Sequence, residues 1–212
     1  MKTLIITLLL PIVSWAESDH QSWNSLKIKS NFANFSYGVE LENRTSGKVS
    51  SANLNQIKPE VFYKLSAGKI GFIYTFETDD MFNEKAENRY SFAYDFKPYK
   101  TDLLEVNTRF RQEFRNFSDQ NQLAYRFRFR NSFNVHVIKF WNVLPAISSE
   151  WRIYQKDSAG KSFENFSHRT VLAFKKPFQQ FELSLHYTHN YQKEDEADQN
   201  THALGFKLGA EI

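Results

Sequence analysis

The protein is a chain of 212 residues, of which 41% are hydrophobic and 24% charged, with a formal net charge of +3. The 21 Phe, 10 Tyr and four Trp, set against seven Gly and five Pro, exclude collagen-like chains, flexible linkers and acidic disordered proteins. The absence of cysteine excludes a disulfide scaffold, and no apolar run after the N-terminal segment reaches the roughly 18 residues of a transmembrane helix. The classes that remain are a soluble β-barrel or sandwich and a β-barrel in an outer membrane.

Residues 1–16 have the three parts of a secretory signal peptide. Lys2 gives a basic start, residues 4–13 form an apolar stretch too short to span a bilayer, and Ser14 and Ala16 are small residues at the cleavage positions. We therefore predict an exported protein, cleaved after Ala16. Residues 17–31 are polar and weakly patterned; we assign them to a periplasmic lead-in, with the start of the first strand as the alternative.

From residue 32 onward, apolar and polar residues alternate in one segment after another, which is the pattern of strands with one apolar face. In residues 122–133, for example, Phe127 and Phe129 share one face, while Arg128 and Arg130 share the other. The alternation predicts ten strands, with twelve as the other possible count, at residues 32–42, 55–65, 70–78, 88–98, 103–115, 122–133, 143–155, 165–175, 180–191 and 201–212. Tight connections mostly alternate with longer polar ones, which, with an even strand count, is typical of bacterial outer-membrane barrels.

Alternation alone does not say which face points inward. In a soluble barrel the aromatic rows would fill the interior, whereas in a membrane barrel they face lipid. Ten strands of bulky aromatic residues would overfill a soluble barrel, because about eight strands already give an interior that side chains just fill. The strands also match the roughly 9–11 residues that cross a bilayer at a tilt. We therefore predict a single-domain, all-β, antiparallel up-and-down transmembrane barrel over residues 32–212, in the outer membrane of a Gram-negative bacterium.

This orientation places a surplus of arginines in the barrel lumen. The predicted lumen and solute-binding residues are Arg109, Arg111, Arg115, Arg126, Arg128, Arg130, Arg152 and Arg169, together with Glu105, Glu113 and Glu150. Lys175 falls on the same face. Arginine carries a permanent charge and a planar set of donors that suits carboxylate and phosphate groups, so a narrow lumen rich in arginine favours anions.

The predicted function is a small monomeric porin-like channel that favours small acidic solutes, for example acidic oligosaccharides. The alternative is a closed structural or surface-interaction barrel without conductance, in which the arginines pair with carboxylates to stabilise the wall. Further lumen carboxylates are available for that pairing on the other strands: Glu40, Glu42, Glu60, Glu77, Asp95, Glu182 and Glu211. The expected surroundings are outer-membrane lipid and lipopolysaccharide.

An enzyme is not predicted, although Ser184, His186 and Glu182 supply the residue types of a hydrolase triad on one strand face. Neighbours on one face are about 6.6 Å apart along a strand, which exceeds hydrogen-bond reach. A lipid-modifying hydrolase is therefore only a third alternative. We predict no cofactor and no metal site, since the acidic residues at 79–80 and 194–198 are interpreted as solvated surface and the second group lacks the glycine and ligand spacing of a calcium loop. A nucleic-acid partner is not expected for an exported chain whose basic face is balanced by carboxylates.

Three stretches, residues 106–115, 123–130 and 145–151, resemble an uncharacterised family of small Gram-negative outer-membrane barrels known only as a domain of unknown function. The first carries the pattern R-x-R-x-E-x-R, the second an arginine at every other position, and the third a proline followed five residues later by glutamate. A looser similarity of architecture and inward arginines is to the oligogalacturonate-specific monomeric porins. Both resemblances imply an outer-membrane barrel, and the second implies passage of acidic oligosaccharides.

Overall fold

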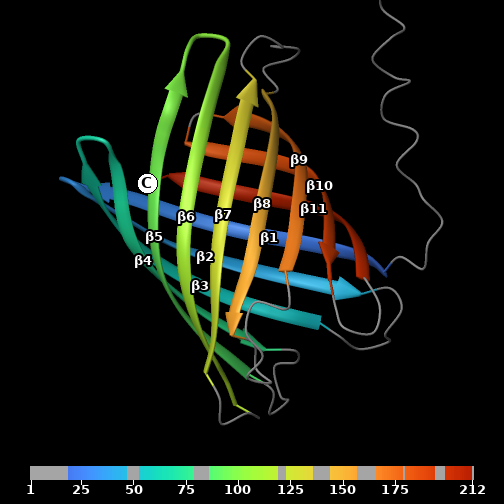
Figure 1. Ribbon diagram of the computed structural model, residues 1–212. Coiled ribbons are helices and arrows are strands. Elements are labelled where there is room, and N and C mark those ends of the chain that lie inside the picture. The colour runs from blue at the N-terminus through green and yellow to red at the C-terminus, as the bar shows by residue number, and fades with distance from the viewer. Residues whose placement is uncertain are drawn as a thin grey trace, which may run out of the picture.

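The computed structural model describes residues 19–46, 53–78, 86–118, 123–135, 144–156, 166–178, 180–193 and 199–211. These residues form eleven strands that close into one barrel (Figure 1). The strands are β1 (Asp19–Phe32), β2 (Phe35–Ser46), β3 (Asn53–Leu65), β4 (Gly68–Thr78), β5 (Ala86–Lys100), β6 (Leu104–Phe117), β7 (Leu123–Val135), β8 (Leu144–Lys156), β9 (Phe166–Phe178), β10 (Phe181–Gln192) and β11 (Gln199–Glu211). In the part of the chain described, no helix is long and apolar enough to cross a membrane. The predicted signal peptide at residues 1–16 lies outside the described residues.

Each strand pairs with the next one in antiparallel fashion, and β1 closes the ring against β11. The closing pair is parallel, running from Asp19 opposite Thr201 to Lys29 opposite Glu211. An odd number of up-and-down strands requires this, because the first and last strands then point the same way. The predicted all-β barrel is confirmed, with eleven strands in place of the even number that the sequence favoured.

The additional strand is β1, which Figure 1 shows lying between β11 and β2. The assignment of residues 17–31 to a lead-in is therefore wrong for residues 19–31, which belong to the barrel. Leu26 and Ile28 face outward and Lys27 inward, but Ser22 and Asn24 make the rest of the outer face polar, which weakens the alternation.

The turn from β1 to β2 also carries a weak sequence signal. It consists of Ala33 and Asn34, and Ala33 has a φ of 52°. Two-residue hairpin turns need such positive φ values and usually take Asn-Gly, Asp-Gly or Gly at these positions. Without a glycine or proline to mark the turn, the sequence placed a strand start at Phe32, which is instead the last residue of β1.

The other ten strands were predicted within four residues of their observed ends. Their apolar faces point outward, as the membrane-barrel alternative requires. Every strand contributes at least one exposed large apolar side chain, among them Phe92 at 59% and Leu185 at 58% exposure. In contrast, the interior buries charged groups such as Glu113 and Arg126, and its apolar cluster is small: Phe62, Ile73 and Ala93 on β3, β4 and β5. The predicted orientation of the two faces is confirmed.

The two ends of the barrel differ in their connections. At one end, called the turn end below, residues 33–34, 66–67, 101–103 and 179–180 join the strands, as does the longer segment 136–143. At the other, called the loop end, the connections fall largely within residues 47–52, 79–85, 118–122, 157–165 and 193–198. The acidic residues at 79–80 and 194–198 lie outside the described residues.

Candidate functional site

The interior of the barrel is lined by the arginines that the alternation placed there. On β6 and β7, Arg109 lies opposite Arg130, and Arg111 lies opposite Arg128. All eight predicted arginines line one cavity: Arg109, Arg111, Arg115, Arg126, Arg128, Arg130, Arg152 and Arg169. In both register pairs an arginine lies opposite another arginine, so carboxylates from elsewhere on the wall are needed to compensate the positive charge.

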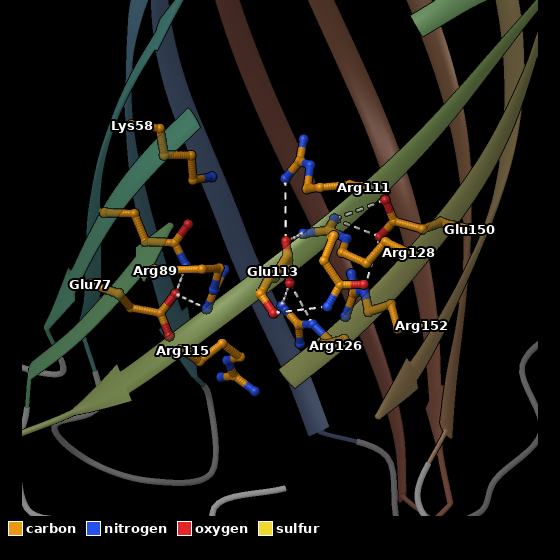
Figure 2. Close-up of polar contacts among 12 residues, drawn as sticks. Lys58, Glu77, Arg89, Arg111, Glu113, Arg115, Arg126, Arg128, Glu150 and Arg152 are labelled. Atoms are coloured by element: carbon orange, nitrogen blue, oxygen red, sulfur yellow. Dashed lines mark hydrogen bonds and ion pairs between the residues drawn. The ribbon is translucent and has the colours of Figure 1, made fainter. Parts of the chain in front are cut away.

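Glu113 is the centre of the most deeply buried ion-pair cluster (Figure 2). Its side chain is fully buried. Arg126 donates from Nε to Oε2 at 2.6 Å, and Arg128 donates from Nη1 to Oε1 at 2.8 Å. Arg111 reaches the same carboxylate at 3.5 Å. One carboxylate therefore compensates three guanidinium groups.

Glu150 extends this cluster to β8. Arg128 donates from Nη2 to both carboxylate oxygens of Glu150, at 2.7 and 2.8 Å. Arg152 donates from Nε to Oε1 at 2.9 Å, and its Nη1 reaches Asn190 at 3.3 Å. Arg128 thus connects the two glutamates, and the cluster ties β6, β7, β8 and β10 together from inside. Removal of either carboxylate would leave buried cations uncompensated.

A second carboxylate cluster lies beside the first, and the sequence analysis placed only two of its members, Glu77 and Arg115, in the lumen. Glu87 accepts from Arg89 at 2.9 Å and from Arg115 at 2.6 and 2.7 Å. Glu77 lies 3.3 Å from Arg89, and Figure 2 shows this pair. Glu87 was missed because the predicted strand began at residue 88, and Arg89 lies within that strand but was not included among the predicted lumen residues. Extending the predicted strand by one residue toward its N-terminus would have found them, because Glu87, Arg89 and Ser91 then share one face.

Lysines and glutamates compensate one another on the part of the wall made by β1, β2, β3 and β11. Lys27 lies 2.6 Å from Glu60 and 3.5 Å from Glu40. Lys207 on β11 reaches across β1 to Glu40 on β2 at 2.7 Å. Nearby, Glu42 binds Lys58 at 2.6 Å, and it also accepts from Arg44. Of the carboxylates that the sequence offered as partners for the arginines, these three mainly serve lysines.

The remaining predicted carboxylates lie nearer the ends of the barrel. Asp95 binds Arg109 through two donors at 2.5 Å each. Glu105 accepts from Lys97 and Asn107 at 2.9 Å each. Glu182 and Glu211 are exposed, and Glu211 accepts from Asn31.

The rings of Trp23 and Phe62 stand inside the barrel among these cations. Trp23 is 7% exposed and is contacted by Arg44 and Arg169, whose guanidinium carbons lie 4.2 and 4.6 Å from the ring centroid. Phe62 is 2% exposed and is contacted by Lys69 at 4.5 Å. A cation over an aromatic face is stabilised by the ring quadrupole, so Trp23 partly compensates Arg169, for which the described residues provide no ion-pair partner.

Two cavities lined by described residues lie along the lumen, one toward each end. The loop-end cavity has a volume of about 590 Å³ and is lined by Gln21, Trp23 and Gln192 near the loop end as well as by the eight arginines. The turn-end cavity has a volume of about 970 Å³ and extends to Asn34 and Gly68 at the short turns. Both cavities are lined by the same four cations, called the junction cations below: Lys29, Arg109, Arg130 and Lys175.

The two cavities differ in how well their cations are compensated. The turn-end cavity is lined by seven cations, Lys29, Lys64, Lys69, Lys97, Arg109, Arg130 and Lys175, and by one carboxylate, Asp95. Arg109 already binds both oxygens of Asp95. Within the described parts of the chain, Lys29 and Arg130 have neither an ion pair nor a side-chain hydrogen bond, and Lys175 contacts only the amide oxygen of Asn134, at 3.2 Å.

The structure does not assemble the residues considered for hydrolysis. Ser184 is buried in the interior, Glu182 is exposed, and the ring of His186 lies over Gly205. Between Ser184 and His186 there is no hydrogen bond in the described structure. No group of three or more His, Cys, Asp or Glu residues among the described ones is arranged to hold a metal ion.

Comparison with known proteins identifies the family but no characterised relative. Residues 20–201 match the family described as "Protein of unknown function (DUF2490)", and the chain belongs to this family. No curated protein and no solved structure matches the chain. The matched region begins within β1 and ends within β11, so it includes all of the strands that carry the arginines.

Proposed function

We propose that this member of a family without an assigned function is a small channel in a bacterial outer membrane that favours small acidic solutes. The observation that carries the proposal is the pair of cation-lined cavities that meet at the junction cations. A basic, narrow aqueous passage raises the local concentration of anions and lowers that of cations.

The outer surface supports a membrane location. Soluble monomers rarely expose contiguous apolar patches of more than a few hundred Å², whereas here every strand exposes large apolar side chains. The strands have 11 to 15 residues, enough for the roughly 9–11 that cross a bilayer at a tilt. The proposal further comprises export by the N-terminal segment, insertion among lipid and lipopolysaccharide, and a monomeric state.

The lumen supports passage of solute along the barrel axis. The lining of the turn-end cavity includes residues of the short turns, and that of the loop-end cavity includes residues close to the opposite ends of the strands. Because both cavities are lined by the junction cations, a solute would contact these cations from either cavity. Acidic oligosaccharides are the solute class that the similarity to the oligogalacturonate-specific porins suggests.

Conductance of the refolded protein in a planar lipid bilayer tests the proposal. We expect discrete current steps and, in a salt gradient, a reversal potential that favours chloride over potassium. Arg130→Gln should reduce this preference because it removes an uncompensated lumen charge, whereas Arg126/Arg128/Arg130→Ala should abolish it if the barrel still folds. Lys100→Gln is the matched control, because Lys100 is exposed and lines neither cavity. Absence of current steps at every voltage would refute the channel.

A closed barrel without conductance is the second candidate, and the clusters around Glu113, Glu150 and Glu87 favour it. Their ion pairs connect neighbouring strands inside the barrel, as expected of a wall stabilised from within. This candidate predicts a folded, membrane-inserted protein that resists heat in a gel-mobility assay but passes no current. A folded protein without current steps would therefore decide for the closed barrel.

A further inference from the structure

We propose that the junction cations form a binding site for a multiply charged oxyanion, with Arg130 as its principal ligand and with Lys29 and Lys175, which form no ion pair in the described structure, as its other donors. The ligand class is a small molecule that bears a phosphate group or two or more carboxylates. The inference deepens the proposed function and rests on it for the role of the site in solute passage.

The first step concerns Arg130, whose neighbours in the sheet cannot compensate it. In register, Arg130 lies opposite Arg109 on β6 and opposite Glu150 on β8. Both oxygens of Glu150 accept from Arg128, and one also accepts from Arg152. Asp95 is held by Arg109 through both of its oxygens. The carboxylates nearest to Arg130 are thus bound by other arginines, and its donors stay open to the lumen.

The second step is that another free cation comes from the opposite wall. In the closed ring of eleven strands, β1 is five strands away from both β6 and β7. Lys29 on β1 and Arg130 on β7 nevertheless line the same two cavities. The neighbouring Lys27, one position along the same face of β1, binds Glu60 and Glu40. No such ion pair exists for Lys29 in the described residues, so its charge adds to that of Arg130.

The third step concerns the charge of the ligand. Guanidinium and ammonium groups bind oxyanions through charge-assisted hydrogen bonds that are about twice as strong as neutral ones. Arg109 and Arg130 lie opposite each other in register, so their like charges repel. Lys29 and Lys175 increase this repulsion. An anion with two or more charges compensates several of these cations at once, whereas chloride or a single carboxylate compensates only one. The site therefore selects by valence as well as by sign.

Calorimetric titration of the refolded protein in zwitterionic detergent tests the site directly. The probes are pyrophosphate, citrate and acetate, each at fixed ionic strength because screening weakens such contacts. We expect saturable binding of pyrophosphate or citrate and none of acetate at the same concentration. Tighter binding of pyrophosphate than of citrate would indicate a phosphate ligand, and tighter binding of citrate would indicate a polycarboxylate. Binding of acetate as tight as that of pyrophosphate and citrate, or no binding of any probe, would overturn the proposal.

Variants locate the binding to the junction. Arg130→Gln and Lys29→Gln should each weaken the binding of the preferred probe about tenfold, as loss of a hydrogen bond to a charged group does. Arg130→Lys keeps the charge but removes the planar donors, so it should lie between Arg130→Gln and the original protein. The matched control is Lys58→Gln, because Lys58 lines only the loop-end cavity and is held by Glu42. Equal affinity in all four variants would refute the junction as the site.

The same variants separate this inference from the proposed channel. Since neither Lys29 nor Arg130 has a side-chain partner in the described structure, their substitution should leave the barrel folded. Pyrophosphate should also raise the unfolding temperature of the original protein and not that of Arg130→Gln, because a ligand stabilises the state that binds it. A protein that binds but does not conduct would refute the channel and retain the site. A protein that conducts, and that binds pyrophosphate equally well before and after Arg130→Gln, would retain the channel and refute the site.

Discussion

The two cavities of one lumen differ in how far carboxylates compensate the cations that line them. Apart from the junction cations, the loop-end cavity has eleven lysines and arginines in its lining, and seven glutamates at or just beneath its surface compensate most of them. The turn-end cavity is larger, is lined by seven cations and has a single carboxylate. The same residue type, arginine on an alternating strand, thus supports the wall of the loop-end cavity and, as Arg130, is a free donor where the two linings overlap.

The difference teaches that a count of lumen charges does not describe their role. Arg128 and Arg130 are two residues apart on one face of β7. Arg128 binds two glutamates, and Arg130 binds none of the described carboxylates. A charge that binds a buried carboxylate supports the fold, because its loss leaves an uncompensated partner. A charge without a partner leaves no uncompensated group behind when it is removed, and for Arg130 the proposed partner is an anion in the lumen.

The largest expected effect comes from the centre of the compensated region. Glu113→Gln removes the charge that three arginines share, so we expect the barrel to lose about 3–5 kcal/mol of unfolding free energy. Urea unfolding of the refolded barrel in lipid vesicles, followed by tryptophan fluorescence, measures this loss. The control is Glu182→Gln on β10, an exposed glutamate, which should change stability by no more than about 0.5 kcal/mol. Equal effects of the two substitutions would show that the Glu113 cluster contributes nothing to stability.

The next effect tests how tightly β11 packs against β1 and β10. A Cβ atom on Gly205 would overlap Nε2 of His186 and the backbone oxygen of Trp23, so Gly205→Ala should cost about 1–3 kcal/mol. Gly209, on the same strand and four residues nearer the turn end, is the matched control. Its nearest neighbour would lie 3.8 Å from the new Cβ, which is ordinary contact, so Gly209→Ala should be neutral in the same unfolding assay. A loss at Gly209 as large as at Gly205 would contradict the described packing of β11 against β1 and β10.

Much of this barrel follows from residue alternation alone. Ten strands, their apolar outer faces and the inward position of all eight arginines were predicted from the period of two. The period reports which face is apolar, and the exposed apolar residues of every strand confirm that this face points outward. β1 was missed because its outer face carries Ser22 and Asn24 and because Ala33 and Asn34 do not form a recognisable turn sequence.

The compensation of each charge could not be predicted from alternation. Arg130 is the register partner of Glu150, yet Glu150 binds Arg128, two residues away on β7. The choice between them depends on side-chain geometry and on the register of β7 against β8. The register of that pair shifts between Tyr125 and Arg126, and no local sequence signal marks such a shift. The ion pair between Lys207 and Glu40 passes over β1, so it depends on a strand that the sequence did not reveal.

A smaller effect is expected at the rim of the turn-end cavity. Lys97 binds Glu105 at 2.9 Å, and the lysine side chain is 54% exposed. Ion pairs that solvent reaches contribute about 0.2–1 kcal/mol, so Glu105→Gln should cost no more than about 1 kcal/mol. The ratio of the effects of Glu113→Gln and Glu105→Gln, measured in one assay, then gives the difference between a buried and a rim carboxylate. A ratio near one would remove the distinction between the two cavities.

The smallest effect on stability is expected at Arg130, and it is the sharpest test of the comparison. Arg130→Gln removes a cation that lies opposite Arg109 and has no ion-pair partner among the described residues. Relief of the like-charge contact should leave the unfolding free energy unchanged or raise it by up to about 1 kcal/mol. Arg128→Gln, two residues away on the same face, should instead be destabilising because it leaves Glu113 and Glu150 with fewer donors. A loss at Arg130 equal to that at Arg128 would mean that Arg130 supports the wall like its neighbours, and the argument for a free anion site at the junction would fail with it.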